Sequence, residues 1–166
     1  IADSLAQSAA LWALRENISE AQKREGLSIK HDVSLPISCI AEFIDRARIA
    51  LMADYPDIRI VCFGHVGDGN LHYNLSKVQA QSNEHFIAQT AAVNRIVHDL
   101  VASLGGSISA EHGLGQLKRD EITRYKSAVE LALMHTIKAA IDPANLMNPG
   151  KVLAAKAINH QLRGPI

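Results

Sequence analysis

The sequence is poor in cysteine and carries no excess charge of either sign. Cys39 and Cys62 are the only cysteines among 166 residues, they form no CxxC pair, and two cysteines cannot build a disulfide framework. This excludes a small secreted scaffold held together by disulfides. Both residues lie in apolar stretches, so we expect free, buried thiols that pack as small hydrophobic residues, which fits a reduced intracellular setting.

The charge balance and the lack of long apolar runs exclude two classes of partner. The 17 basic and 17 acidic residues cancel, so no overall field attracts nucleic acid or an anionic membrane surface. No apolar run approaches the ~20 residues that cross a bilayer, and the N-terminus lacks the pattern of a signal peptide. We therefore expect no nucleic-acid partner and no membrane span.

The hydrophobic spacing predicts an α+β fold, and the length suits one domain with a sizeable core. In the middle of the chain the elements follow the order β-α-β-β-α-β. This is the order of the ferredoxin-like, split βαβ arrangement, an antiparallel sheet with both helices on one face. Further helices would be added at the two ends. The predicted helices are residues 4–25, 36–52, 83–104, 114–125 and 128–141, and the predicted strands are 27–35, 58–66, 70–76 and 107–109.

The first motif that carries chemistry is GHVGDGNLHYN at residues 64–74. Here His65 and His72 flank a glycine-rich turn between two predicted strands. A hairpin folds the chain back, so both neutral imidazoles can point into one metal site. The alternative is that each imidazole bonds carbonyl groups of the turn.

The second motif is SAEHGLG at residues 109–115. Glu111 adds a carboxylate to His65 and His72, and three protein ligands leave open positions, as in a reactive metal site. Zinc suits these ligands, while manganese, iron and cobalt are also compatible. His112 is a candidate general base, because an imidazole titrates near neutral pH. The alternative for His112 is a capping role or support of another ligand.

A third group could bind a carboxylate. Arg15 and Ser19 are one helical turn apart, and Lys30 follows in the next predicted strand. A guanidinium can hold a carboxylate through two hydrogen bonds, and the hydroxyl and ammonium can add to this clamp. The alternative is a set of solvated surface side chains.

Together these motifs resemble the C-terminal domain of FAD-linked oxidases of the vanillyl-alcohol-oxidase superfamily. The similarity is to members that oxidise D-2-hydroxyacids such as lactate, glycolate or 2-hydroxyglutarate. The GHVGDGNLH and SAEHGLG segments are its most specific parts. The matching segments lie in order along most of the chain, at residues 11–16, 30–36, 64–74, 107–115 and 142–151.

The resemblance implies a role for each matching position. The divalent metal, with zinc first and manganese or iron as alternatives, would be bound by His65, His72 and Glu111. His112 would take the hydroxyl proton of the substrate, or stabilise the forming alkoxide, as hydride passes to FAD. Arg15, Ser19 (commonly Thr in these relatives) and Lys30 would hold the substrate carboxylate. Asn74 would contact the substrate elsewhere, and Asn148 would lie against the flavin.

The resemblance also implies that FAD is bound by a second domain, which these 166 residues do not include. We find no glycine-rich pyrophosphate-binding segment, and the chain begins with Ile1 in place of Met, just before a predicted helix. We therefore expect residues 1–166 to be the C-terminal substrate- and metal-binding domain of a longer protein whose N-terminal FAD-binding domain is absent here. Such a fragment would be inactive alone. Its partners would be a small 2-hydroxyacid, its own FAD-binding domain and an electron acceptor, in a bacterial cytoplasm or a mitochondrion. Oligomeric state stays open, with a homodimer as one option.

Two other functions are compatible with the metal motifs. A stand-alone metal-dependent hydrolase could use the same three ligands to activate water. A non-catalytic metal- or ligand-binding module could use the metal only to hold the fold together. Neither accounts for the basic clamp or for the NPGK segment at residues 148–151.

Overall fold

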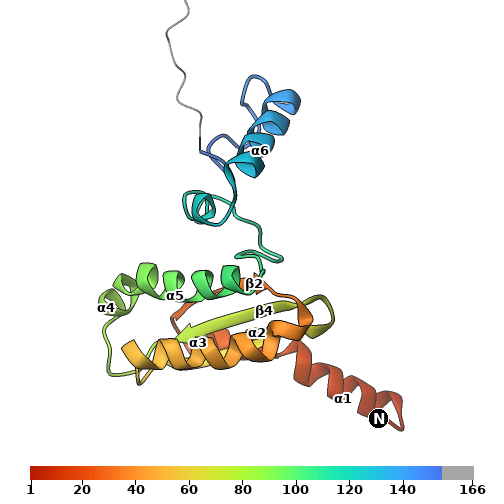
Figure 1. Cartoon of the computed structure of the whole chain (residues 1–166). Helices are drawn as coiled ribbons and strands as arrows, with labels where there is room; N and C mark the ends of the chain where they lie inside the picture. Colours follow the sequence, from red (N-terminus) through yellow and green to blue (C-terminus); the bar gives the residue numbers. More distant parts are fainter. Residues whose placement is uncertain (155–166) are drawn as a thin grey trace, which may run out of the picture. The chain divides into compact units, whose positions relative to one another are not determined.

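The computed structural model describes residues 1–154, which form two compact units, residues 1–111 and the residues from His112 onward. Figure 1 follows the elements along the chain. In the part that the structure describes, no helix is long and apolar enough to cross a bilayer. Each unit is described by itself.

The first unit is built on a four-stranded antiparallel sheet. The longest strands, β3 and β4, form a hairpin, while β1 and β2 both pair with the other edge of β4. A single bridge then joins Ser34 to Ser107. Across the sheet, the Ser107 segment is followed by β1 and β2, then by β4 and then by β3. This is the ferredoxin-like order, and it confirms the predicted fold class. The strands are β1 (Ser28–Ile29), β2 (Asp32–Ser34), β3 (Arg59–His65) and β4 (Asn70–Ser76).

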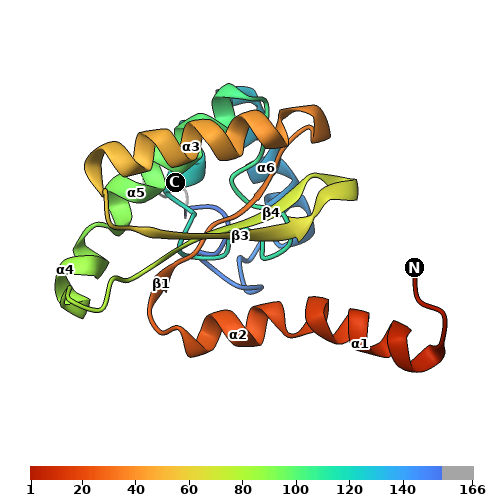
Figure 2. The ribbon, with the colours of Figure 1, turned by 90° about the horizontal axis from the view of Figure 1, so that it is seen from below.

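Helices cover both faces of the sheet in the first unit. The second unit contains α6. Figure 2 shows α3 and α5 on one side of the sheet and α1 and α2 on the other. The helices are α1 (Leu5–Glu16), α2 (Ile18–Arg24), α3 (Ile40–Asp54), α4 (Asn83–Ala88), α5 (Thr90–Ser103) and α6 (Ala128–Ile141). Short 3-10 turns precede α3 (Ile37–Cys39), join β3 to β4 (Val66–Asp68) and precede α6 (Glu121–Arg124).

Strand β4 separates an apolar core from a polar face, because successive side chains of a strand point to opposite sides. Its odd-numbered residues pack with α3 and α5, and Phe43 meets Tyr73 edge to face at 5.2 Å. Burying each such side chain contributes about 1.5–3 kcal/mol. The even-numbered residues of β4 are polar and point the other way. The core includes Val33, Phe43, Ala47, Leu51, Leu71, Tyr73, Leu75, Val93, Val97 and Val101.

The prediction of free cysteines is confirmed. Cys39 and Cys62 are unpaired thiols, and both are half-buried. Burial against the core raises the pKa of the Cys62 thiol to about 11, since the thiolate would lose its hydration. Cys62 is therefore neutral at physiological pH and packs as an apolar residue.

Several predicted elements are interrupted in the structure. The helix predicted at residues 4–25 divides at Asn17, a residue type that favours helix ends over helix interiors. The strand predicted at 27–35 is interrupted because the backbone N–H of His31 donates to the Asn74 side chain instead of a strand carbonyl. The strand predicted at 107–109 is reduced to the Ser107 bridge.

The helix predicted at residues 114–125 was wrong. The structure has turns there, followed by the 3-10 turn Glu121–Arg124. Gly115 adopts a left-handed backbone (φ +55°), and its carbonyl accepts a hydrogen bond from the Val152 N–H, so the segment cannot continue as an α-helix. The helix predicted at 128–141 is confirmed with the same limits, and a capping box of Ser127 and Glu130 begins it.

The turn between β3 and β4 depends on Gly69. This residue has φ +77°, its carbonyl accepts from the Leu35 N–H at 3.0 Å, and an added Cβ would lie 2.0 Å from the Leu35 carbonyl oxygen. Both the backbone angle and the close approach require glycine. By contrast, no described atom lies within 4 Å of a Cβ added at Gly67.

We expect Gly69→Ala to lower the free energy of unfolding by about 2 kcal/mol or more, because it adds both strain and a clash with backbone. Gly67→Ala, two residues away, is the matched control and should stay within about 0.5 kcal/mol of the wild type. Equilibrium urea unfolding measures both. Equal losses in the two variants would contradict this account of the turn.

Candidate functional site

The candidate site lies on the polar face of the sheet, near the hairpin turn. Residues directly opposite each other on neighbouring strands point to the same face. His72 on β4 stands between Asp32 on β2 and Phe63 on β3, and His65 stands opposite Asn70. The imidazole of His72 also packs against the Phe63 ring, with 5.0 Å between centroids. The pairing register thus gathers polar side chains that are far apart in the sequence.

Glu111 lies between the two predicted metal-binding histidines. Its Oε1 is 2.8 Å from His65 Nδ1, and its Oε2 is 3.6 Å from His72 Nε2. The His65 and Glu111 side chains are nearly half exposed, whereas that of His72 is 16% exposed. The structure therefore brings the three predicted ligands together within the first unit, on a face open to solvent.

Arg15 joins this group from helix α1. Its Nη2 lies 3.0 Å from His65 Nε2, and its guanidinium lies over the Trp12 ring at 5.3 Å from the centroid. Because a guanidinium only donates, His65 Nε2 accepts this hydrogen bond and the Nδ1–H donates to Glu111. One predicted carboxylate-binding residue is thus in contact with one predicted metal ligand.

Asp32 is a member of the site that the sequence argument missed. It is 2% exposed. Its Oδ2 accepts from the backbone N–H groups of Ala110 (3.2 Å) and Glu111 (2.9 Å), and its Oδ1 accepts from Asn70 Nδ2 (3.1 Å). The same Oδ1 is 3.8 Å from His72 Nδ1. A signal existed, since aspartate is depleted in strands and this one interrupts an apolar strand pattern.

Asn74, a predicted substrate contact, connects α2 to the sheet. It is 3% exposed. Its Oδ1 accepts from the His31 N–H at 3.1 Å, and its Nδ2 donates to Gln22 Oε1 at 2.9 Å. The amide therefore holds α2, and with it the end of α1 that carries Arg15, against the polar face.

The other predicted residues are exposed. Ser19 lies on α2, and Lys30 lies between β1 and β2. His112 and Asn148 belong to the second unit, where Asn148 adopts a left-handed backbone (φ +48°) and its carbonyl accepts from the Lys151 N–H. Of the predicted set, the structure thus gathers Arg15, His65, His72 and Glu111, with Asn74 on the same face.

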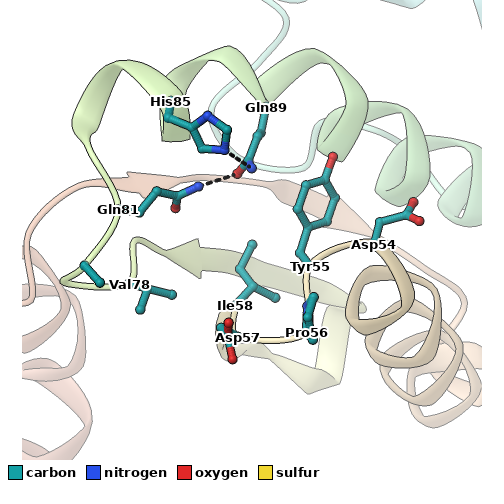
Figure 3. Close-up of a pocket in the computed structure, with 10 residues that line it drawn as sticks. Asp54, Tyr55, Pro56, Asp57, Ile58, Val78, Gln81, His85 and Gln89 are labelled. Carbon is teal, nitrogen blue, oxygen red and sulfur yellow. Dashed lines mark hydrogen bonds between the residues drawn. The ribbon is translucent and has the colours of Figure 1, made fainter.

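A cavity of about 350 Å³ lies at the opposite end of the sheet (Figure 3). Polar side chains line it, with Gln81 Nε2 donating to Gln89 Oε1 at 3.2 Å and the Gln89 amide bonded to His85 Nε2 at 3.3 Å. It adjoins the start of β3 and the end of β4, and strands of seven residues place it ~20 Å from the hairpin turn. The cavity is therefore separate from the candidate site.

The sequence of the chain matches the family described as FAD linked oxidases, C-terminal domain, over residues 1–152. This chain is a member of that family. The resemblance drawn from the motifs is thereby confirmed, and the candidate site lies in the matched region of this FAD-linked oxidase C-terminal domain.

Three curated relatives similar to this FAD-linked oxidase chain carry the name D-2-hydroxyglutarate dehydrogenase. D-2-hydroxyglutarate dehydrogenase of Xanthomonas citri pv. viticola is 44% identical over 152 residues, which is 92% of this chain and 32% of the relative. The Stutzerimonas stutzeri enzyme of the same name is 42% identical over 145 residues (87% and 31%). The mitochondrial enzyme of Danio rerio is 40% identical over 146 residues (87% and 26%). The chain spans about a third or less of the length of these relatives.

We expect Asn74→Ala to lower the free energy of unfolding by about 2 kcal/mol, because the buried His31 N–H and Gln22 Oε1 both lose their partner. Ser19→Ala, on the exposed part of α2, is the control and should change stability by less than about 0.5 kcal/mol. Urea unfolding of Asn74→Ala, Gln22→Ala and the double variant measures the coupling directly. Strictly additive losses would mean that the Asn74 amide does not hold α2.

Proposed function

We propose that this chain is the substrate- and metal-binding part of an FAD-dependent dehydrogenase that oxidises D-2-hydroxyglutarate to its 2-oxoacid. The observation that carries the proposal is the convergence of Arg15, His65, His72 and Glu111 on one face of the sheet. Membership of the FAD-linked oxidase family supports the use of FAD, which a separate FAD-binding domain would hold. The shared name of the relatives supports this substrate over lactate or glycolate.

The three proposed metal ligands fit a divalent ion, with zinc first and manganese or iron as alternatives. Ligand atoms around one tetrahedral zinc, with bonds of about 2.0–2.2 Å, lie roughly 3.3–3.6 Å apart. Glu111 lies 2.8 Å from His65 and 3.6 Å from His72 through different oxygens, so the three side chains would have to move closer together around one ion. Two imidazoles and one carboxylate leave a coordination position for a substrate oxygen.

Arg15 is placed to hold the substrate carboxylate beside this ion. A guanidinium binds a carboxylate through two parallel hydrogen bonds, and its contact with His65 fixes where the bound anion would lie. Ser19 and Lys30 are exposed and would add a hydroxyl and an ammonium to the clamp. Asn74 would keep α2 in place, and its proposed direct contact with substrate would require exchange of one present hydrogen bond.

The remaining roles concern proton and hydride transfer. When bound, the metal polarises the 2-hydroxyl as a Lewis acid and the flavin accepts the hydride. His112 would accept the proton of that hydroxyl as a general base. Asn148 would lie against the flavin. The electrons would then leave to an external acceptor, and bacterial and mitochondrial relatives fit either location for the whole protein.

A hydrolase or a purely structural metal module is less well supported. Both could use the same three ligands, but neither is expected in a chain that belongs to the FAD-linked oxidases. A hydrolase would also leave the contact between Arg15 and His65 without a purpose.

The substrate proposal is tested on the full-length protein that contains this chain. We expect its oxidised flavin absorption to bleach with D-2-hydroxyglutarate and far less with D-lactate or glycolate. Arg15→Ala should lower kcat/KM roughly 10- to 100-fold, the effect of losing hydrogen bonds to a charged group. His85→Ala, in the distant cavity, is the control and should keep wild-type kinetics. A protein without flavin absorption, or a flavin that no 2-hydroxyacid reduces, would contradict the proposal.

The metal is tested by removing it. We expect a chelator to abolish flavin reduction and added zinc to restore it, and we expect His65→Ala to reduce bound zinc to well below one equivalent. Circular dichroism of His65→Ala should stay that of the wild type, because His65 is exposed and outside the core. Unfolding of His65→Ala on metal loss would favour the structural role instead.

A further inference from the structure

Asp32 is a buried carboxylate whose place in the sheet needs a reason. A charge that is almost fully removed from water is unfavourable unless hydrogen bonds replace its hydration. Asp32 sits in the short strand β2, and both of its oxygens accept hydrogen bonds from other segments. Those segments carry the proposed metal ligands, which points to a functional role.

The Oδ2 side of Asp32 fixes the backbone of Glu111. Hydrogen bonds hold both ends of residues 107–111 to the sheet. At one end is the pair of backbone bonds between Ser34 and Ser107, at 3.0 and 2.8 Å. At the other end is the Asp32 carboxylate, which accepts from the N–H groups of Ala110 and Glu111. The Asp32 carboxylate therefore holds the backbone from which the Glu111 side chain extends.

The Oδ1 side of Asp32 faces His72. The imidazole presents Nδ1 to Asp32 Oδ1 at 3.8 Å and Nε2 to Glu111 Oε2 at 3.6 Å. A histidine that binds a metal through one nitrogen commonly directs its other N–H toward a carboxylate, which selects the tautomer and orients the ring. Asn70 Nδ2 donates to the same Oδ1 and keeps the carboxylate turned in this direction.

We propose that Asp32 is the positioning residue that sets His72 and Glu111 in the mutual geometry that a divalent metal requires. The inference rests on the proposed metal site and deepens it. One carboxylate controls the ring of one ligand and the backbone of the other. An asparagine has one acceptor oxygen, so it could not accept from the Ala110 and Glu111 N–H groups on one side and also present an acceptor to His72 Nδ1–H on the other. The three N–H bonds that its oxygens accept connect Asp32 to the segments that carry both proposed ligands.

The test compares Asp32→Asn with Asp68→Asn in the full-length protein. Asp68 is a matched control, since its carboxylate accepts from the Asn70 N–H in the same hairpin. We expect Asp32→Asn to weaken zinc binding by the metal-free protein about 10- to 100-fold, the usual effect of losing such a supporting carboxylate. Asp68→Asn should stay within about threefold of wild type. Competition with a chromogenic chelator, using zinc alone, gives the dissociation constants.

A second readout separates positioning from general destabilisation. The visible spectrum of bound cobalt reports ligand geometry only in folded, metal-saturated protein. We expect it to change in Asp32→Asn and to match the wild type in Asp68→Asn. If Asp32→Asn does not fold, Asp32→Glu, which keeps the charge but shifts the carboxylate, should show the same altered spectrum and weaker zinc binding.

The outcomes separate this inference from the proposed function. Wild-type zinc affinity and an unchanged cobalt spectrum in Asp32→Asn, with binding lost in His72→Ala, would overturn the role of Asp32 and leave the metal site intact. Failure of the wild-type protein to bind zinc would overturn both.

Discussion

Every strand of the first unit pairs with β4, and the register of that strand decides where each functional side chain lies. The odd-numbered residues of β4 join the core under α3 and α5, and its even-numbered residues form the polar face. A slip of one residue would exchange the two sets, removing the core and the site together. The hairpin turn and the bond between Leu35 and Gly69 oppose that slip, so the packing that stabilises the fold also positions the candidate ligands.

The polar face has its own requirement, because its buried groups must be hydrogen-bonded. Asp32, Asn70 and Asn74 are almost fully buried, and each is bonded to a segment outside its own strand. These bonds hold the Glu111 segment on one side and α2 on the other. Apolar contacts could also hold the Glu111 segment and α2 against the sheet, but they are less directional than hydrogen bonds and would fix the two positions less closely.

Much of this arrangement could be predicted from the sequence, and the rest could not for identifiable reasons. Strand β4 and helix α6 were predicted with the limits they have, because period-two and period-3.6 hydrophobic patterns are unambiguous over seven to fourteen residues. The association of Glu111 with the two histidines followed from motifs at strand ends. Asp32 was missed because its role depends on pairing across the sheet. The segment 114–125 was predicted as a helix from its residue pattern, while Gly115 sets a left-handed backbone that periodicity does not reveal.

Helix α1 supplies Arg15 to the site, yet none of its side chains is buried in the described structure. Residues outside a core tolerate substitution at little cost to stability, usually within about 0.5 kcal/mol. A clamp placed on such a helix can change in length, charge or position while the fold persists. Relatives with the same sheet could therefore differ at this helix, and so in what they bind beside the proposed metal site, without loss of the fold.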